Sequence, residues 1–344
     1  MRIIVDGFGG DNAPLSVIEG CALAVKELGA DIILTGDEKK IAATAEEHGI
    51  SLAGIQVVHA PDVIPMEEEP TQLLKTYQNS SMAVGFRLLA DGAGSAIVTA
   101  GSTGAAVVGA NLIVKRIRGI KRCAIGTVIP SPETGGSYML IDSGANSECR
   151  PEMLRQFGLM GSVYMERIEG VQAPRVGLVN IGTEESKGRD LQRETFTLLQ
   201  GSELNFIGNV EAREVPLGGC DVAVCDGFTG NVMLKLIEGM AKMFSHQLKG
   251  MLLHSFGTKI AALLLKDQIS AFKKIFDSNE RGGALMLGAR RPVIKVHGNA
   301  NALAVKNGIA QAMSCCENGV VEEITRALTE IADAGQKPEQ DTAD

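Results

Sequence analysis

Short apolar runs alternate with longer helical windows along most of this chain, and this alternation constrains the fold more than any other feature of the sequence. Residues 3–6, 31–35 and 55–59 have the composition of buried strands, while residues 16–28 and 41–48 between them are amphipathic at helical spacing. Such alternation is typical of β-α-β units. We therefore expect a three-layer α/β/α fold with a mainly parallel mixed sheet. Further strands are expected at residues 95–100, 123–129, 137–141, 175–180, 205–208, 221–225 and 293–296, and further helices at 81–90 and 191–199.

Parallel strands end at a common edge of their sheet, and ligands of open α/β sheets usually bind there. We therefore expect the loops after the strands to meet in one cleft. The chain has 344 residues, which exceeds the roughly 250 to 300 that one hydrophobic core supports. Residues 1–334 are expected to form a single α/β catalytic unit with two subdomains around that cleft, and residues 335–344 a polar tail.

Composition narrows the classes of partner and cofactor. The net charge of −8, without a basic stripe interleaved with aromatic residues, disfavours nucleic acid. Seven Cys without a CxxC pair indicate a reducing, cytoplasmic compartment, and five His without metal-like spacing predict no metal site. Met1 leads directly into the first strand, so no signal peptide is expected, and no apolar run approaches the about 18 to 20 residues of a bilayer span.

The most informative loop joins a strand to a helix within residues 221–235. Its turn is rich in small residues whose backbone amides can approach a ligand, and the dipole of the following helix favours an anion there. Turns of this kind also serve as ordinary connections in α/β proteins. The expected anion-binding and ligand-orienting residues of this loop are Asp226, Gly227, Thr229, Gly230 and Asn231.

Two loops in the first third of the chain repeat this arrangement. One follows the first strand at residues 6–14 and the other follows the strand at 95–100, and each places glycines and polar side chains before a helix. The first contains neither GxGxxG nor a Walker pattern, so we expect no dinucleotide cofactor. In the second, Ser102 and Thr103 are also ordinary N-cap residue types. The expected phosphate-binding residues are Asp6, Gly9, Gly10, Asp11, Asn12, Gly101, Ser102, Thr103 and Gly104.

Three further loops carry polar side chains after strands, at residues 141–146, 180–188 and 208–213. Lys187 is the cation we favour for charge neutralisation, because a Lys in a Gly-flanked loop is well placed to meet an oxyanion. The alternative is a solvated loop lysine. The residues expected to bind or orient the ligand in these loops are Asp142, Asn146, Lys187, Asn209 and Glu211.

No residue lies in a recognisable nucleophile motif. The chain lacks a GxSxG elbow, Cys149 is only a residual covalent candidate, and His297 is set beside a loop glycine without an obvious partner. This pattern favours direct attack by a bound nucleophile over an acyl-enzyme.

Residues 237–276 interrupt the alternation with a long helical pattern and no strand, which predicts a helical hairpin broken at Gly257. Its first helix carries an apolar stripe from Ile237 to Leu252 that we expect to be buried. Its second helix has more apolar circumference than one packing face needs, with interspersed lysines, so contact with anionic lipid or an acidic partner is reasonable. Packing within the subunit or at a dimer interface is the alternative. The expected membrane or acyl-chain contacts are Ile260, Leu263 and Leu264.

Taken in order, these loops resemble the bacterial phosphate acyltransferase family of phospholipid synthesis, usually called PlsX. The resemblance extends over nearly all of the chain before residue 330, and several motifs in order are more specific than any one of them. Residues 280–286 depart from the family pattern, which leaves the contribution of that segment open. The residues that carry the resemblance are Val5-Asp6, Gly9 to Pro14, Ala100 to Ala105, Asp142 to Asn146, Gly208 to Glu211, Asp226 to Val232 and Val296 to Asn299.

The resemblance implies a fold similar to the isocitrate and isopropylmalate dehydrogenases. It implies an enzyme that converts fatty acyl-[acyl carrier protein] and inorganic phosphate to acyl phosphate and free carrier protein, for phospholipid synthesis and without a cofactor. It also implies a homodimer associated peripherally with the inner face of the cell membrane. The loops would then hold phosphate beside the thioester carbonyl and stabilise the tetrahedral oxyanion. The expected catalytic residues are Lys187, Asn209, Asp226 and Asn231.

Two other functions stay open at this point. One is a phosphotransacetylase-like transfer between acyl coenzyme A and phosphate, and the other is an inactive membrane-docking scaffold. The phosphotransacetylase-like enzyme would accept a different thioester from the phosphate acyltransferase, and the scaffold would show no turnover.

Overall fold

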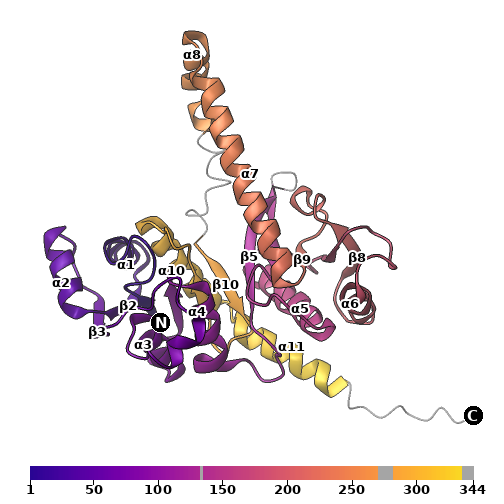
Figure 1. Ribbon diagram of the computed structural model, residues 1–344, viewed down its shortest axis with the longest axis horizontal. Helices are drawn as coiled ribbons and strands as arrows, with labels where there is room; N and C mark the ends of the chain where they lie inside the picture. The colour runs from indigo at the N-terminus through magenta and orange to yellow at the C-terminus, as the bar shows by residue number, and fades with distance from the viewer. Residues whose placement is uncertain (132–134, 270–281, 335–344) are drawn as a thin grey trace, which may run out of the picture.

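The computed structural model describes residues 1–131, 135–269 and 282–334, and its strands form one sheet with helices on both faces (Figure 1). The sheet has eleven strands in the order β3-β2-β1-β4-β11-β10-β5-β6-β9-β7-β8. This arrangement confirms the α/β fold with a mainly parallel mixed sheet. None of the described helices is long and apolar enough to cross a membrane.

The first half of the sheet consists of five parallel strands close to their expected positions. Ile3 and Val5 pack into the core on one face and Ile4 into the core on the other, because side chains alternate along a strand. Both faces are covered, which is why these strands are continuous apolar runs in the sequence. The strands are β1 (Arg2–Asp6), β2 (Asp31–Gly36), β3 (Ile55–His59), β4 (Ala96–Thr99) and β11 (Val293–Lys295).

Four strands of the second half of the sheet run in the opposite direction. β5 (Ala124–Ser131) is antiparallel to β6 (Gly136–Ile141), and β9 (Val222–Val224), β7 (Val176–Asn180) and β8 (Phe206–Glu211) continue parallel to β6. The carboxyl ends of β6, β7, β8 and β9 therefore lie at the opposite edge of the sheet from those of β1, β4 and β11, whereas β5 runs in the same direction as β1. The expectation that all the loops share one edge was wrong, because antiparallel pairing reverses the direction of the sheet.

One central strand was not identified from the sequence. β10 (Ala284–Leu287) pairs antiparallel with both β11 and β5 and thereby joins the two halves of the sheet. It is only four residues long and is flanked by glycines at positions 282, 283 and 288, so its pattern does not differ from that of a turn.

The helices form two layers, and the helices expected at residues 16–28, 41–48, 81–90 and 191–199 are confirmed. One layer contains α1 (Leu15–Leu28), α5 (Pro151–Arg167), α6 (Asp190–Gln200), α10 (Ala302–Glu317) and α11 (Val320–Ala334), with α2 (Glu38–Glu47) beside α1. The other contains α3 (Ser81–Ala90), α4 (Thr103–Val108) and its π-helical continuation η2 (Gly109–Lys115). Two short 3-10 turns are η1 (Pro70–Leu74) and η3 (Val215–Leu217).

A helical hairpin projects away from the sheet (Figure 1) and consists of α7 (Gly227–Leu253) and α8 (Phe256–Leu264). Only the root of α7 is packed against the body, and α8 has no buried residue. Phe244 and Met251 of the stripe expected to be buried are 56% and 68% exposed. That expectation was wrong for the single chain, because the helix extends beyond the edge of the sheet.

The hairpin turns at Ser255 rather than at the expected Gly257. The Ser255 hydroxyl accepts a hydrogen bond from the amide of Thr258 at 3.2 Å and so caps α8, in which Gly257 is an ordinary helical residue. Residues 270–276 of the expected hairpin and the expected tail at 335–344 lie outside the described residues.

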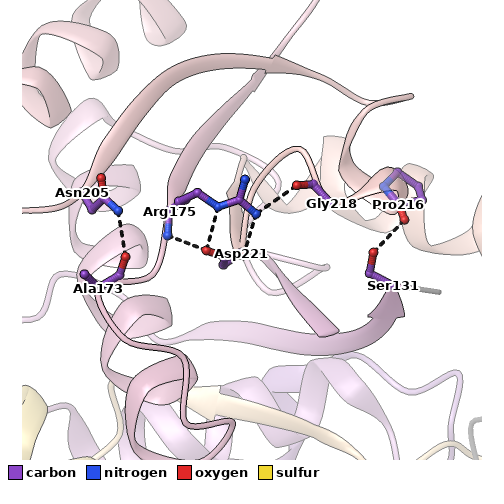
Figure 2. A network of polar contacts seen from close by, with 7 residues as sticks. All are labelled: Ser131, Ala173, Arg175, Asn205, Pro216, Gly218 and Asp221. Carbon is purple, nitrogen blue, oxygen red and sulfur yellow. Dashed lines mark hydrogen bonds and ion pairs between the residues drawn. The ribbon is translucent and has the colours of Figure 1, made fainter. Parts of the chain in front are cut away.

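A polar network holds the amino ends of β7 and β9 together (Figure 2). The Arg175 guanidinium donates to both carboxylate oxygens of Asp221, at 2.9 and 3.1 Å, and to the carbonyl oxygen of Gly218 at 2.9 Å. At the end of β5, the Ser131 hydroxyl donates to the carbonyl oxygen of Pro216 at 3.1 Å. Because the Arg-carboxylate pair is bidentate, it fixes geometry better than a single surface contact does. The network therefore sets the register of these strands at the edge away from the loops that follow β6, β7 and β9.

Gly230 tests how tightly the root of α7 is packed. A Cβ at Gly230 would lie 1.9 Å from the carbonyl oxygen of Asp142, whereas a Cβ at Gly239 on the same helix would meet nothing within 4 Å. Gly230→Ala should lower the free energy of unfolding by about 3 kcal/mol. Gly239→Ala should raise it by up to about 1 kcal/mol. Chemical denaturation measures both, and equal midpoints for the two variants would contradict this packing.

Candidate active site

The loops that follow β1, β4 and β11 form a first cluster of expected site residues. A Cβ at Gly9 would lie 2.5 Å from the amide nitrogen of Gly101, so only glycine allows these loops to approach so closely. The amide of Asp11 donates to the carbonyl oxygen of Gly298 at 2.7 Å, and the Asn12 side chain donates to two further carbonyl oxygens of the same loop. The first and second expected anion loops therefore do meet.

Two buried charged groups lie beneath this first cluster. The Asp6 carboxylate accepts a hydrogen bond from the Thr99 hydroxyl at 2.7 Å, and burial raises the pKa of this carboxyl. Lys295, at the end of β11, is 8% exposed and its ammonium donates to the carbonyl oxygen of Ala100 at 3.3 Å. Burial lowers the pKa of Lys295 to about 8, although Asp6 and Asp11 oppose the effect. An anion beside Lys295 would meet a poorly solvated cation, which attracts it more strongly than a hydrated one.

A second cluster forms at the opposite edge, where the loops after β6 and β9 meet the root of α7. Both carboxylate oxygens of Asp142 are occupied: Oδ1 accepts from the amides of Ile125 and Ala145, and Oδ2 from the amide and side chain of Asn146. The Asn146 side chain also donates to the carbonyl oxygen of Cys123 at 2.8 Å. These bonds give Asp142 and Asn146 a structural role, and their contact with phosphate stays a prediction.

The expected anion turn at the start of α7 also uses its donors within the chain. The amide of Gly227 donates to the carbonyl oxygen of Asn146 at 2.7 Å, and the amide of Thr229 donates to Asp226 at 2.9 Å. Asp226 thus caps α7, with the guanidinium of Arg189 at 3.7 Å from its carboxylate. Ordinary helix capping therefore accounts for the hydrogen bond between Asp226 and Thr229.

The loops after β7 and β8 form the outer part of this second cluster. The ammonium of Lys187 is half-exposed and lies 3.8 Å from the Glu184 carboxylate. Asn209 donates to the carbonyl oxygen of Glu184 at 2.9 Å, and Glu211 pairs with Arg213 at 2.7 Å. These contacts connect the loops to each other, and a role for Lys187, Asn209 and Glu211 in the reaction stays a prediction.

Both clusters border one cavity of about 710 Å³. Thr103 and His297 reach it from the first cluster, and Gly144 and Asn231 from the second. The cavity exists because β10 pairs only with residues 124–126 of β5, so the rest of that strand has no neighbour on this side among the described strands. Thr103 and Asn231 are the predicted site residues that line it. Those that do not are Asp6, Gly9, Gly10, Asp11, Asn12, Gly101, Ser102, Gly104, Asp142, Asn146, Lys187, Asn209, Glu211, Asp226, Gly227, Thr229 and Gly230.

One side of the cavity is polar and the other is apolar. Asn231, Lys235 and Glu238 project from successive turns of α7, and the His297 imidazole lies 3.7 Å from the Glu238 carboxylate. Burial lowers the pKa of His297, which Glu238 opposes and nearby lysines reinforce. The cavity can therefore hold an anion beside a hydrocarbon chain. The apolar side is lined by Ile125, Val128, Ile129, Pro130, Leu234, Ile237 and Ala241.

Sequence reasoning missed several of these residues. Lys295 interrupts the apolar run Val-Ile-Lys-Val at the end of a strand, which is a signal for a buried cation. Lys235 and Glu238 follow Asn231 at helical spacing, which places them on its face of α7. In the segment left open by the sequence, residues 282–284 line the cavity, while 280 and 281 lie outside the described residues.

Cys149 does not have the character of a nucleophile. Burial raises the pKa of its thiol to about 12, and the thiol donates to the carbonyl oxygen of Asn146 at 3.6 Å. Among the residues that the structure describes, no three His, Cys, Asp or Glu side chains gather closely enough to hold a metal ion.

Comparison with known proteins identifies the family. Residues 1–323 match the model of a family described as fatty acid synthesis protein. The chain is 43% identical to the phosphate acyltransferase of Acetivibrio thermocellus over 96% of its own length and 97% of the relative. It is also 43% identical to the phosphate acyltransferase of Clostridium acetobutylicum, over 96% of its length and all of the relative. The chain therefore belongs to the fatty acid synthesis protein family that includes these phosphate acyltransferases, as its loops indicated.

Solved structures with the same fold are more distant in sequence. A phosphotransacetylase from Streptococcus pyogenes superimposes with a TM-score of 0.63 at 16% identity and covers 94% of both chains. A putative 4-hydroxythreonine-4-phosphate dehydrogenase from Salmonella typhimurium gives a TM-score of 0.50 at 14% identity, over 91% of this chain and 98% of the other. These likenesses support the expected similarity to dehydrogenase-like folds.

Proposed function

We propose that the protein transfers a fatty acyl group from acyl carrier protein to inorganic phosphate, which yields acyl phosphate for phospholipid synthesis. The observation that carries this proposal is the cavity, which sets cations and a polar helix face beside an apolar wall. The relatives named phosphate acyltransferase support the reaction type. Phosphate is itself the nucleophile, so the reaction needs no covalent intermediate on the chain.

The cavity provides a place for each reacting group. Phosphate would bind near Lys235 and Lys295, whose charges offset its own. Asn231 adjoins Gly144, and its side-chain amide would donate to the carbonyl oxygen as the tetrahedral intermediate forms. The acyl chain would lie between β5 and α7. Attack then forms a C–O bond to phosphate and breaks the C–S bond of the thioester.

Turnover of a carrier-protein thioester tests the proposed function. Wild-type protein incubated with palmitoyl carrier protein and labelled phosphate should form a labelled acyl phosphate, whose label should return to inorganic phosphate when hydroxylamine converts the acyl group to a hydroxamate. Asn231→Ala should lower kcat by about 100-fold, because it removes one oxyanion donor. Asn318→Ala, at an exposed asparagine after α10, should keep the wild-type rate.

The same assay separates the alternatives. Absence of labelled product from the wild type would reject the proposed function, and vesicle binding without turnover would favour the scaffold. Faster turnover of acetyl coenzyme A than of the palmitoyl carrier protein would favour the phosphotransacetylase-like reaction.

The proposed reaction also moves one proton. Hydrogen phosphate loses its P–OH proton as acyl phosphate forms, and the departing thiolate gains a proton. His297 faces the cavity beside Glu238, and its lowered pKa favours a neutral imidazole that can accept a proton. We propose that His297 takes the proton from phosphate and returns it to the sulfur.

Leaving-group dependence tests this role of His297. His297→Gln should lower kcat by about 100-fold on an alkyl thioester. The loss should be much smaller on an aryl thioester of the same acyl chain, because an aryl thiolate leaves without protonation. Asn231→Ala serves as the control, and its kcat should fall by the same factor on both thioesters. An equal loss for His297→Gln on both would contradict the assignment.

Two exposed apolar regions lie outside the cavity and suggest further contacts. Phe228, Val232 and Leu236 follow one another at i, i+4 spacing along α7 and are 67%, 52% and 64% exposed. At the hairpin tip, Leu263 and Leu264 are 73% and 77% exposed, with Ile260 beside them at 47%. Exposed apolar side chains grouped on one helix face mark protein or membrane contacts. We propose that the α7 stripe packs against a second copy in a homodimer and that the tip contacts the inner face of the cell membrane from the cytoplasm.

Substitutions in each exposed region distinguish the membrane contact from the dimer contact. Leu263→Glu with Leu264→Glu should reduce sedimentation with anionic vesicles by about tenfold and leave the mass from light scattering unchanged, because a charge at the tip disfavours insertion. Leu236→Glu should instead reduce the mass from twice 36.2 kDa to that of one chain. Unchanged sedimentation in the first variant, or unchanged mass in the second, would refute the corresponding contact.

A further inference from the structure

The densest cluster of positive charge in the chain runs from the last residue of η2 toward β5, where residues 115–122 read KRIRGIKR. The side chain of Arg290, in the turn between β10 and β11, adjoins this segment and donates to the carbonyl oxygen of Arg116 at 3.1 Å. These cations are exposed, apart from the half-buried Arg116. We call them the basic rim: Lys115, Arg116, Arg118, Lys121, Arg122 and Arg290.

The segment that carries most of the basic rim is anchored to the body of the protein. Ile117 and Ile120 are 4% and 5% exposed and anchor the segment in the body. The amide of Ile117 donates to the carbonyl oxygen of Gly288 at 2.9 Å. From α5, the Gln156 side chain accepts from the amide of Lys121 and donates to the carbonyl oxygen of Gly119, both at 2.9 Å. The apolar side chains are thus held inside, and the cations are left outside.

The charges of the basic rim are not compensated within the chain. None of its six side chains lies within 4.0 Å of a carboxylate oxygen in the parts of the chain that the structure describes. Like charges this close repel one another, and the protein as a whole carries a net charge of −8. A local excess of positive charge on an acidic protein fits a ligand surface rich in carboxylates or phosphates.

One end of the basic rim lies close to the cavity. Arg122 lies three residues before Ile125, which lines the cavity, and three residues span at most about 10 Å of chain. Between them, the carbonyl oxygen of Cys123 accepts from the Asn146 side chain, which joins the segment to the loop that holds Gly144 at the cavity wall. A ligand on the basic rim is therefore close to the site at which the thioester would react.

The position of the basic rim disfavours a lipid surface as its ligand. The segment lies beside the root of α7, whose 27 residues extend about 40 Å to the hairpin tip. In Figure 1 the segment that enters β5 lies at the end of the molecule away from α8. A membrane in contact with the tip would not reach the basic rim. The segment has no aromatic residue on which bases could stack, which disfavours single-stranded nucleic acid.

We propose that the basic rim is the docking surface for an acidic face of the acyl carrier protein, which presents its thioester to the cavity from the root end of α7. This inference rests on the proposed function, since it names how that substrate is held. Docking of opposite charges raises the rate of association and makes it sensitive to salt. The basic rim would then act on the carrier protein and leave the chemistry in the cavity unchanged.

Neutralising three cations tests the docking surface. For Arg118→Gln, Lys121→Gln and Arg122→Gln combined, KM for palmitoyl carrier protein should rise at least about tenfold, and the effect should shrink at high salt. The rate on a palmitoyl thioester of free pantetheine should stay at the wild-type value. The matched control combines Lys26→Gln, Lys39→Gln and Lys40→Gln on α1 and α2, which removes the same charge far along the sheet and should leave both values unchanged.

A binding measurement keeps this test separate from the proposed function. Fluorescence anisotropy with labelled carrier protein lacking an acyl group should show about tenfold weaker binding to the rim variant than to the control variant, whether or not turnover is detected. Unchanged KM and unchanged binding would overturn the inference. An equal loss of rate on the carrier-protein and pantetheine thioesters would also overturn it, because that result would indicate damage to the cavity. Loss of binding to phosphatidylglycerol vesicles with carrier-protein binding intact would overturn it as well.

Discussion

The buried carboxylate of Asp142 is the constraint on which the rest of the site depends. It lies between the start of β5 and the end of β6, where it accepts hydrogen bonds from Ile125, Ala145 and Asn146. Burial raises the pKa of this carboxyl, and the hydrogen bonds oppose that rise and make an ionised group tolerable there. Asn146 in turn accepts from the amide of Gly227. One anchor thus fixes the start of β5, the loop beside the cavity and the root of α7.

The position of α7 explains how a sheet with two directions builds a single cavity. The loops after β4 and β11 and the loops after β6 and β9 lie at opposite edges, so they do not meet directly. α7 begins at the second set, and its residues 231–241 line the cavity along β5 up to residues that follow β11. Because β10 is short, no strand among the described residues fills that space. α7 therefore supplies a polar face, and α7 and β5 together supply the apolar wall.

Three regions with different proposed functions lie along α7. Its root adjoins the basic rim, its middle lines the cavity, and its far end carries the exposed hairpin tip. In the proposed function these parts would hold the carrier protein, the reacting groups and the membrane. A long helix suits this arrangement because its 1.5 Å rise per residue spaces the three regions rigidly.

The sequence by itself determined most of the strands and helices, the family and the loops around the cavity, because local periodicity, turn residues and ordered motifs carry that information. It identified Thr103 and Asn231, but it missed Lys295, Lys235 and Glu238 as cavity residues. Only the tertiary structure decided that the sheet reverses at β5 and β6, that β10 lies at its centre and that Phe244 and Met251 of α7 are exposed. Strand direction and burial depend on contacts between residues far apart in the chain, which no local pattern records.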